Sequence, residues 1–401
     1  MLLGGIIAEF NPFHNGHKYL IEKAREDGCT HIVCVMSGNF VQRGDVAIAS
    51  KWARAKAAVS GGADLIVELP TPFALSSAQD FARGGVSVLD SMSCVDRLYF
   101  GSECGELSLL FQTANAMGTE EYGELVQHFL QSGISYPAAC EKAVNRIIGK
   151  DSKSVLRSPN DTLASSYICA LKNASSRIEP KAVKRVASEH DRFGQYGNFA
   201  SAAYIRQILL SKGFNGDAEL LMPKESAEIL KDEFSCGKAP CILEKLQTSI
   251  LSKLRSMTAE DFKEIPGVSE GLHNRLYSKV RKATGIDSLI EEAETKRYTY
   301  SRIRRIVLLS YLSLTKDYVP ESAPYIRVLA LNERGREILK ECKKKACVPI
   351  ITKAASALRL EDGFAKRLFD KECEMTDKFF LSSPKIMPCG AELTEKIIGQ
   401  K

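Results

Sequence analysis

Short apolar runs, each ended by a polar or Pro/Gly-containing stretch, alternate with amphipathic segments in the first half of the chain. The runs that we interpret as strands span residues 3–10, 31–36, 64–69, 97–100 and 181–186. The amphipathic segments between them include residues 18–25, 49–60 and 77–90. Buried parallel strands are nearly continuous in apolar residues, and strands that alternate with helices form βαβ units. The pattern therefore predicts an α/β fold with a doubly wound, Rossmann-like parallel sheet.

The rest of the chain has a mainly helical pattern. Residues 106–175 are expected to be largely helical, and beyond about residue 212 the sequence shifts to Lys- and Glu-rich helix patterns. Two further strands are predicted at residues 325–331 and 348–352, around a helix. A chain of 401 residues is long enough for two or three domains. We predict an α/β domain at residues 1–211 and a mostly helical C-terminal region at residues 212–401.

A segment with two histidines follows the first apolar run. Pro12 sets a turn and ends the strand. His14 and His17 are three residues apart, which places both on one face at the start of a helix. Gly16 lets a ligand approach the backbone closely. Two imidazoles beside the N–H groups of a helix N-terminus can bind a polyphosphate. Such a pair also occurs by chance on surfaces or as half of a metal site, but its place directly after a strand favours the phosphate site.

The segment resembles the H-x-G-H signature of the nucleotidyltransferase superfamily, which includes the class I aminoacyl-tRNA synthetases. This resemblance implies a reaction in which the α-phosphate of ATP is attacked and pyrophosphate leaves. A doubly wound order would place the first and fourth runs side by side, and ligands bind outside the carboxyl ends of strands at such a switch point. These ends lie at Phe10–Asn11 and Gly101. We therefore expect ATP between the histidine segment and Gly101.

Two later segments carry further candidate residues. Ser158 and Pro159 are expected to cap and begin a helix, which leaves Asn160 to face the nucleotide. Residues 199–206 open another helix and resemble the second superfamily signature, in which hydroxyls hold the β- and γ-phosphates and an arginine neutralises leaving pyrophosphate. Ser201 and Arg206 match this signature, whereas Ala203 stands where a hydroxyl residue is common.

Composition narrows the class of protein. The net charge of +6 permits an acidic partner such as RNA without requiring one. No apolar run reaches the roughly 18 residues of a membrane span, and no signal peptide is evident. The 12 cysteines form no C-x-x-C pair and no zinc-ligand spacing. We therefore expect a cytoplasmic protein with reduced thiols and no dedicated metal site.

Several sequence blocks together are similar to one family. They lie at residues 8–17, 36–45, 64–70, 100–103, 158–161, 264–272 and 296–305. These blocks resemble the tRNA(Met) cytidine acetate ligase family over nearly the full length. The resemblance implies an enzyme that activates acetate with ATP to acetyladenylate and then acetylates the exocyclic amine of the wobble cytidine in elongator tRNA(Met). We expect Mg²⁺ to arrive with the ATP phosphates, since no dedicated carboxylate cage is visible in the sequence, and no protein partner is evident.

The same resemblance implies a set of ATP contacts. These are Ile7, Ala8, Glu9, Phe10, Asn11, Pro12, Phe13, His14, Asn15, Gly16, His17, Lys18, Tyr19, Leu20, Gly101, Asn160 and Arg185, to which the second signature adds Ser201 and Arg206. We expect His14 and His17 to be catalytic, by binding the phosphates and the charge that develops on them. The residues that serve as acid or base in acyl transfer are not identifiable from the sequence.

A basic segment is the candidate for RNA contact. Residues 296–305 contain two tyrosines among the basic residues Lys296, Arg297, Arg302, Arg304 and Arg305. Tyrosines can stack on bases and arginines can bind phosphates, which favours RNA. A charge run is also often a solvated helix face, and here the arginines could instead pair with Glu291, Glu292 and Glu294.

Two other functions remain open at this point, and so does the selection of acetate. One is a small-molecule adenylyltransferase of cofactor biosynthesis, which would need no basic C-terminal half. The other is a non-catalytic RNA-binding protein with a vestigial pocket, against which the intact H-x-G-H segment argues. The loop at residues 37–44 leaves the second strand beside the pocket, so Asn39 and Gln42 are candidates for selecting acetate.

Overall fold

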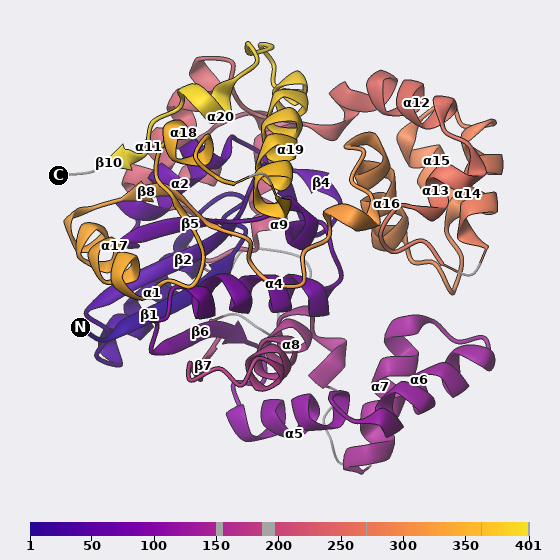
Figure 1. The fold of residues 1–401 in the computed structure, drawn as a ribbon, viewed down its shortest axis with the longest axis horizontal. Coiled ribbons are helices and arrows are strands. Elements are labelled where there is room, and N and C mark those ends of the chain that lie inside the picture. The colour runs from indigo at the N-terminus through magenta and orange to yellow at the C-terminus, as the bar shows by residue number, and fades with distance from the viewer. Residues whose placement is uncertain (150–154, 187–196, 270, 362, 400–401) are drawn as a thin grey trace.

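A mostly parallel sheet forms the centre of the molecule (Figure 1). The computed structural model describes residues 1–149, 155–186, 197–269, 271–361 and 363–399. The strand order is β10-β8-β5-β2-β1-β6-β7, and β9 also pairs with β8. The parallel strands of the first half are β1 (Leu3–Ala8), β2 (His31–Ser37), β5 (Leu65–Leu69), β6 (Arg97–Ser102) and β7 (Glu179–Lys184). The predicted α/β class is confirmed, and the first and fourth predicted strands, β1 and β6, are neighbours as expected.

Helices cover both faces of the sheet because successive strand residues point to opposite sides. Ile6, Cys34 and Ile66 face α1 (Asn15–Glu26) and α2 (Lys51–Ser60). Ile7 and Val35 face the other layer, which is built from α4 (Ala78–Ser91), α8 (Pro159–Asn173) and α17 (Glu333–Lys345). All seven residues of β2 are buried, so the continuous apolar run predicts a central strand correctly.

The C-terminal half contributes both a helical bundle and part of the sheet. The bundle consists of α12 (Gln247–Ser256), α13 (Ala259–Lys263), α14 (Leu272–Val280), α15 (Ile286–Ala293) and α16 (Tyr300–Tyr311), and its core also includes residues of α19 (Phe364–Phe379). Strand β8 (Ile326–Leu331) runs antiparallel to β5, and β9 (Ile350–Ile351) and β10 (Ile398–Gly399) flank β8. The division at residue 211 stays a prediction, since three later strands extend the same sheet.

The remaining helices and strands lie around these layers (Figure 1). They are β3 (Phe40–Val41), β4 (Asp45–Val46), α3 (Thr71–Ala74), α5 (Leu107–Met117), α6 (Glu120–Gln131), α7 (Tyr136–Ile148), α9 (Ala202–Lys212), α10 (Gly216–Glu219), α11 (Lys224–Ser235), α18 (Ala354–Ala357) and α20 (Ala391–Thr394), with 3-10 turns at Val155–Arg157, Leu243–Leu246, Lys316–Tyr318 and Phe380–Ser382. In the part of the chain that the structure describes, no helix has the length and apolarity needed to cross a membrane.

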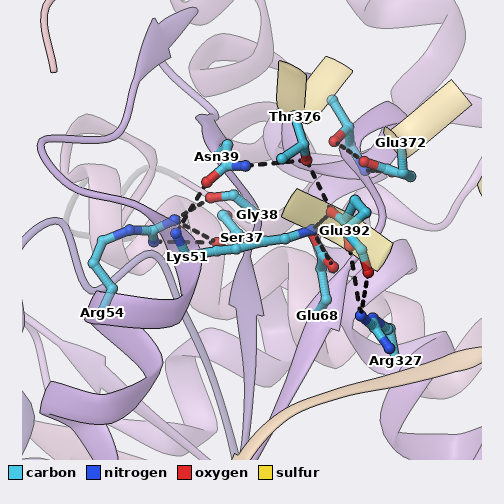
Figure 2. Close-up of polar contacts among 11 residues, drawn as sticks. Ser37, Gly38, Asn39, Lys51, Arg54, Glu68, Arg327, Glu372, Thr376 and Glu392 are labelled. Atoms are coloured by element: carbon cyan, nitrogen blue, oxygen red, sulfur yellow. Dashed lines mark hydrogen bonds and ion pairs between the residues drawn. The ribbon is translucent and has the colours of Figure 1, made fainter. Parts of the chain in front are cut away.

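Five charged side chains, Lys51, Glu68, Arg327, Glu372 and Glu392, form a buried charge cluster between the sheet and the C-terminal helices (Figure 2). Lys51 Nζ donates to both carboxylate oxygens of Glu68, at 2.7 and 2.8 Å, and also to Glu392. Glu392 lies 3.6 Å from Arg327 Nη2 as well. Removing one partner of such a buried ion pair leaves the charge of the other uncompensated. The cluster therefore fixes α20 against β5 and α2.

The same cluster holds more carboxylates than cations. Thr71 donates to Glu372 through its backbone N–H at 2.7 Å and through its hydroxyl at 2.6 Å. Burial, and then the nearby Glu68, raise the pKa of Glu372 to about 8. Two cations face three carboxyl groups, so Glu372 keeps a proton at neutral pH more readily than an exposed glutamate does.

Candidate functional site

The histidine segment forms a tight loop between β1 and α1. Phe10 turns the chain at the end of β1 with φ of 47°, a left-handed conformation that few non-glycine residues adopt. The chain enters α1 at His14, which is the N-cap residue of this helix. The Phe10 ring packs edge-on against Phe13 and His17, with ring centroids 5.0 and 4.9 Å apart. Apolar packing therefore holds the loop that presents the histidines.

The two imidazoles hold each other and the helix N-terminus in place. His14 Nδ1 accepts a hydrogen bond from the Gly16 N–H at 3.0 Å, and His17 Nδ1 accepts from the His14 N–H at 3.2 Å. The rings stack with centroids 3.7 Å apart. A neutral imidazole that accepts at Nδ1 carries its proton on Nε2. Both histidines therefore offer an Nε2–H donor.

Both side chains are neutral rather than cationic. Burial, and then Arg185 and Arg206, lower the pKa of His14 to about 3. Burial, and then His14 and Arg185, lower the pKa of His17 well below its usual value. The pair can therefore donate hydrogen bonds to a phosphate while both rings are neutral.

Gly16 is needed for a reason that the sequence did not indicate, which is the close approach of the His14 ring to its backbone. A Cβ at Gly16 would lie 2.9 Å from His14 Cε1 and 3.0 Å from His14 Nδ1. The absent side chain thus leaves room for the imidazole ring of His14, in addition to any close approach by a ligand.

A cavity of about 280 Å³ opens at the carboxyl ends of β1 and β6. This volume is near the lower end of the usual range for small-molecule sites. Most of the predicted ATP contacts line it, namely Ile7, Ala8, Glu9, Phe10, Asn11, His14, Gly16, His17, Tyr19, Leu20, Gly101, Asn160 and Arg185. We call it the first cavity. Its position is the one that the switch-point argument predicts.

Other predicted contacts do not line the first cavity. Pro12 and Phe13 lie on the side that faces α2 and α11. Asn15 donates through its side-chain amide to the carbonyl oxygens of Asn198, at 2.8 Å, and Leu220, at 3.0 Å. Lys18 is on the outer face of α1. Pro12, Phe13 and Asn15 support the loop from behind, whereas Lys18 is exposed. Contact of these four residues with ATP stays a prediction.

The second signature contributes through Arg206 rather than through Ser201. Ser201 caps α9, because its hydroxyl accepts from the Tyr204 N–H at 3.2 Å. Arg206 Nη1 donates to the carbonyl oxygen of Asn11 at 2.7 Å, and its charge acts on His14. Neither lines the first cavity, although Ala200 and Ala202 do. Arg206 thus fixes the backbone of the histidine loop, and its role toward pyrophosphate stays a prediction.

Glu103 is a residue of the site that sequence reasoning missed. It accepts hydrogen bonds from the Asn160 amide and the Ser158 hydroxyl, and its carboxylate lies 3.7 Å from Arg185 Nε. Ser158 occupies the N-cap position of α8, but its side chain caps nothing and binds Glu103 instead. Glu103 therefore positions two candidate ATP contacts at once.

Asp161 explains why the start of α8 lies beside the end of β6. Asp161 accepts from the backbone N–H groups of Glu103, at 2.9 Å, and Cys104, at 3.1 Å, and from the Ser102 hydroxyl. The sequence signal for these contacts was that the block at residues 100–103 ends a predicted strand in polar residues, and that the block at residues 158–161 begins a predicted helix.

Arg54 joins the ends of the first two strands, and Figure 2 shows its contacts with Ser37 and Gly38 after the second. Its guanidinium donates to the carbonyl oxygens of Glu9 at 2.6 Å, of Ser37 at 3.1 Å, and of Gly38. The carboxylate of Glu9 in turn accepts from the Gln42 N–H at 2.7 Å. Gln42 and Arg43 therefore stand at the wall of the first cavity.

The loop at residues 37–44 separates into two parts. Gln42 lines the first cavity, as its candidacy for acid selection requires. Asn39 does not line it. The buried Asn39 side chain accepts a hydrogen bond from the Lys51 N–H at 2.9 Å and donates one to Thr376 Oγ1 at 3.2 Å (Figure 2). We accordingly keep only Gln42 as a candidate for contact with the acid.

The basic segment lies at the start of α16, and its arginines bind the backbone. Arg302 donates to Gly267 O at 2.8 Å, and Arg304 donates to Gly44 O at 2.8 Å and pairs with Asp45 at 2.8 Å. Arg305 donates to Gln42 O at 3.4 Å. Among the described residues, these three arginines form no ion pair with Glu291, Glu292 or Glu294, in contrast to the alternative considered from the sequence. Lys296 and Arg297 are exposed, and RNA contact by the segment stays a prediction.

No metal site emerges from the described residues. Among them, no three His, Cys, Asp or Glu side chains gather in a group that could hold a metal ion. Charge near the first cavity instead comes from Arg43, Arg185 and the more deeply placed Arg206.

Comparisons with known proteins agree with the geometry. The profile of the HIGH nucleotidyl transferase family matches residues 1–388. A tRNA(Met) cytidine acetate ligase of Acetivibrio thermocellus is 36% identical and covers 98% of this chain and 99% of its own length. One from a Thermoanaerobacter species is 37% identical and covers 98% of both chains. The crystal structure of Thermotoga maritima TmcAL bound with alpha-thio ATP superimposes with a TM-score of 0.91 at 33% identity, covering 100% of this chain and 99% of that one. The chain therefore belongs to the tRNA(Met) cytidine acetate ligase family of HIGH nucleotidyl transferases.

Proposed function

We propose that this protein is an ATP-dependent ligase that activates acetate as acetyladenylate and acetylates the wobble cytidine of elongator tRNA(Met). The observation that carries the proposal is the pair of Nε2–H donors at His14 and His17, at a helix N-terminus in a cavity between the ends of β1 and β6. Preorganised donors of this kind stabilise charge that develops on transferring phosphoryl groups.

In the first step an acetate oxygen attacks the α-phosphorus of ATP. The bond from this phosphorus to the oxygen that bridges to the β-phosphate breaks, and pyrophosphate leaves. His14 and His17 donate hydrogen bonds to the phosphate oxygens, and Arg185 neutralises part of their charge. Glu103 holds Arg185 and Asn160 at the edge of the cavity. The step needs no side-chain nucleophile, because positioning and charge stabilisation supply the rate.

In the second step the exocyclic amine of cytidine attacks the acetyl carbonyl carbon. The bond between this carbon and the phosphate oxygen breaks, and AMP leaves. We place Gln42 beside the acetyl group, because it lines the first cavity and its backbone N–H is held by the Glu9 carboxylate. RNA contact is assigned to the surface around α16, with Lys296 and Arg297 exposed at its start.

Mg²⁺ is expected to enter with the ATP phosphates rather than from a protein cage. Mg²⁺ typically binds through substrate phosphates and one or two carboxylates. Glu9 lines the first cavity and is the carboxylate placed to meet such a complex. We expect the enzyme to act in the cytoplasm on free tRNA, without a protein partner.

The proposal is tested by exchange of labelled pyrophosphate into ATP, across a panel of small carboxylic acids and cofactor precursors. We expect exchange that depends on acetate and needs no tRNA, together with transfer of labelled acetate to tRNA(Met). Exchange with a cofactor precursor but not with acetate would instead identify a small-molecule adenylyltransferase. Binding of tRNA without any exchange would identify a non-catalytic RNA-binding protein.

A further inference from the structure

A second cavity, of about 320 Å³, lies between α3, α4, α7 and α16. Figure 1 shows α16 and the α6–α7 pair on the same side of the α/β core. Among the described residues that line this cavity, four are arginines, Arg83, Arg297, Arg302 and Arg305, and one is an acid, Asp80. We call it the second cavity. Its charge favours an anionic ligand.

The single carboxylate is already satisfied by its neighbours. Asp80 accepts from the Ser77 hydroxyl at 2.9 Å and from Arg83 Nη2 at 3.1 Å. Arg83 also donates to backbone carbonyl oxygens at residues 320 and 321, and its guanidinium lies over the Phe73 ring at 5.1 Å. These two residues therefore form a fixed wall of the cavity, and Arg302 is held by Gly267 O and the Ser269 hydroxyl.

Arg305 has unused donor capacity. Within the part of the chain that the structure describes, its guanidinium makes one hydrogen bond, the 3.4 Å contact to Gln42 O. A guanidinium carries five N–H donors. Burial, and then Arg302, lower the pKa of Arg305 to about 10, because the cation is partly desolvated beside another cation. A phosphate oxygen at this point would supply both the missing acceptors and the missing negative charge.

Tyr136 supplies an aromatic surface at the same cavity. It is the first residue of α7, and 43% of it is exposed. Its phenol interacts electrostatically with Arg302 and Asp80, which lie on other elements of the wall. An exposed ring beside a cluster of arginines is the combination that binds single-stranded nucleic acid, with the base on the ring and the phosphate on the cation.

The second cavity adjoins the first through shared walls. Ala78 and Phe81 of α4 line the first cavity, whereas Ser77, Asp80 and Arg83 of the same helix line the second. Gln42 lines the first cavity and accepts from Arg305 of the second. The turn before β4 is also packed tightly on α16, since a Cβ at Gly44 would lie 2.6 Å from Arg305 N.

We propose that the second cavity binds a nucleotide of the single-stranded tRNA loop that neighbours the cytidine being acetylated, with its base against Tyr136 and its phosphate at Arg305. This inference rests on the proposed function, since it assigns the place where the RNA next to the reactive cytidine is held. It adds a base-stacking site on α7 to the exposed basic segment. Helix α7 belongs to the part of the chain that precedes the predicted division at residue 211.

The test uses the full-length protein and a short RNA stem-loop that carries the tRNA(Met) anticodon. Tyr136→Ala should weaken its binding about five- to hundredfold, the range expected for losing one base stacked on an aromatic ring. Tyr136→Phe should bind like the unchanged protein. Tyr277→Ala is the matched control, because Tyr277 is 38% exposed and also lies beside an arginine, with Arg281 at 4.4 Å from its ring, but on α14 outside the cavity. It should have no effect.

Further readouts separate RNA contact from a structural role. Arg305→Gln should reduce the slope of log affinity against log salt by about one, the amount for one phosphate contact. Tyr136→Leu keeps an apolar side chain and serves if the alanine variant does not fold; it should lose affinity as well. Unchanged stem-loop affinity in the folded Tyr136→Ala or Tyr136→Leu variant would overturn the inference. So would a loss of affinity in Tyr277→Ala as large as that in Tyr136→Ala. Acetate-dependent pyrophosphate exchange and tRNA acetylation by the unchanged protein test the proposed function separately.

Discussion

Lowering the pH from about 7 to about 5 should destabilise the protein through His14. Its pKa is lowered to about 3 in the folded protein by burial and by two arginines, whereas an unfolded chain has the ordinary value of about 6.5. Between these values the unfolded state binds a proton that the folded state does not. The free energy of unfolding therefore falls as the pH falls through this window.

The size of the effect follows from the shift. One pKa unit corresponds to about 1.36 kcal/mol. A pH of about 5 lies about 1.5 units below the pKa of His14 in the unfolded chain and well above its pKa in the folded protein. The free energy of unfolding should therefore be about 2 kcal/mol lower at this pH because of His14. The cost is close to zero at a pH of about 7 and continues to grow until the pH reaches about 3. ATP should reduce it, because a polyphosphate beside the ring favours the protonated form.

Urea unfolding of the unchanged protein and of His14→Asn at both pH values measures this contribution. Asparagine is a preferred N-cap residue, so it can still accept the hydrogen bond from the Gly16 N–H, but it does not titrate. Carboxyl groups such as Glu372 are common to both proteins, and their effect cancels in the difference. We expect the unchanged protein to lose about 2 kcal/mol more than the variant on acidification. Equal losses would show that His14 is not a buried neutral imidazole.

Four further predictions concern individual residues of the site. His17→Ala should lower acetyladenylate formation about 10²-fold or more in a folded protein, because a preorganised donor is lost; a full pyrophosphate-exchange rate would refute this. Gln42→Ala should change the preference among small acids in the same assay, whereas Asn39→Ala should lower the melting temperature and leave the preference unchanged. Glu103→Gln should raise the KM for ATP about tenfold, since one charged partner of Arg185 and Asn160 is lost; an unchanged KM would show that neither contacts ATP. Arg304→Gln should lower the melting temperature by removing the pair with Asp45, and unaltered melting would show that this link contributes nothing.

The parallel sheet and the location of the first cavity could be predicted because they follow from local patterns. Continuous apolar runs and intervening helices determine the strands, and the right-handed crossover rule brings the first and fourth runs together. The histidine loop was also recognisable, since strand, proline turn and helix start are contiguous in the sequence. The hydrogen bond from the His14 N–H to His17 Nδ1 required only the spacing of three residues, although the tautomers of the two imidazoles could not be assigned before the geometry was known.

Contacts between distant segments could not be predicted in this way. Glu103 meets Asn160 across 57 positions, and nothing in either block states that the other lies beside it. Strand β8 pairs antiparallel with β5, which no crossover rule for parallel units anticipates. The arginines of α16 illustrate a third difficulty. A basic helix segment can face solvent, RNA or backbone carbonyls, and only the packing of α16 on the turn before β4 shows that Arg304 donates to Gly44.

The buried charge cluster has a consequence for the order in which a newly synthesised chain can fold. Lys51 and Glu392 are 341 positions apart, so Lys51 leaves the ribosome long before this partner exists. Until β8 emerges, the edge of β5 also lacks its neighbour, and an unpaired strand edge invites association with other chains. A partly made chain can assemble β1, β2 and β5 and can pair Lys51 with Glu68, but this pair lacks Glu392 and the edge of β5 stays unpaired. Translation of the C-terminal segments is therefore a precondition for a stable α/β core, and a chain that stops before residue 392 should be recognised by chaperones or proteases rather than persist as an inactive half-enzyme.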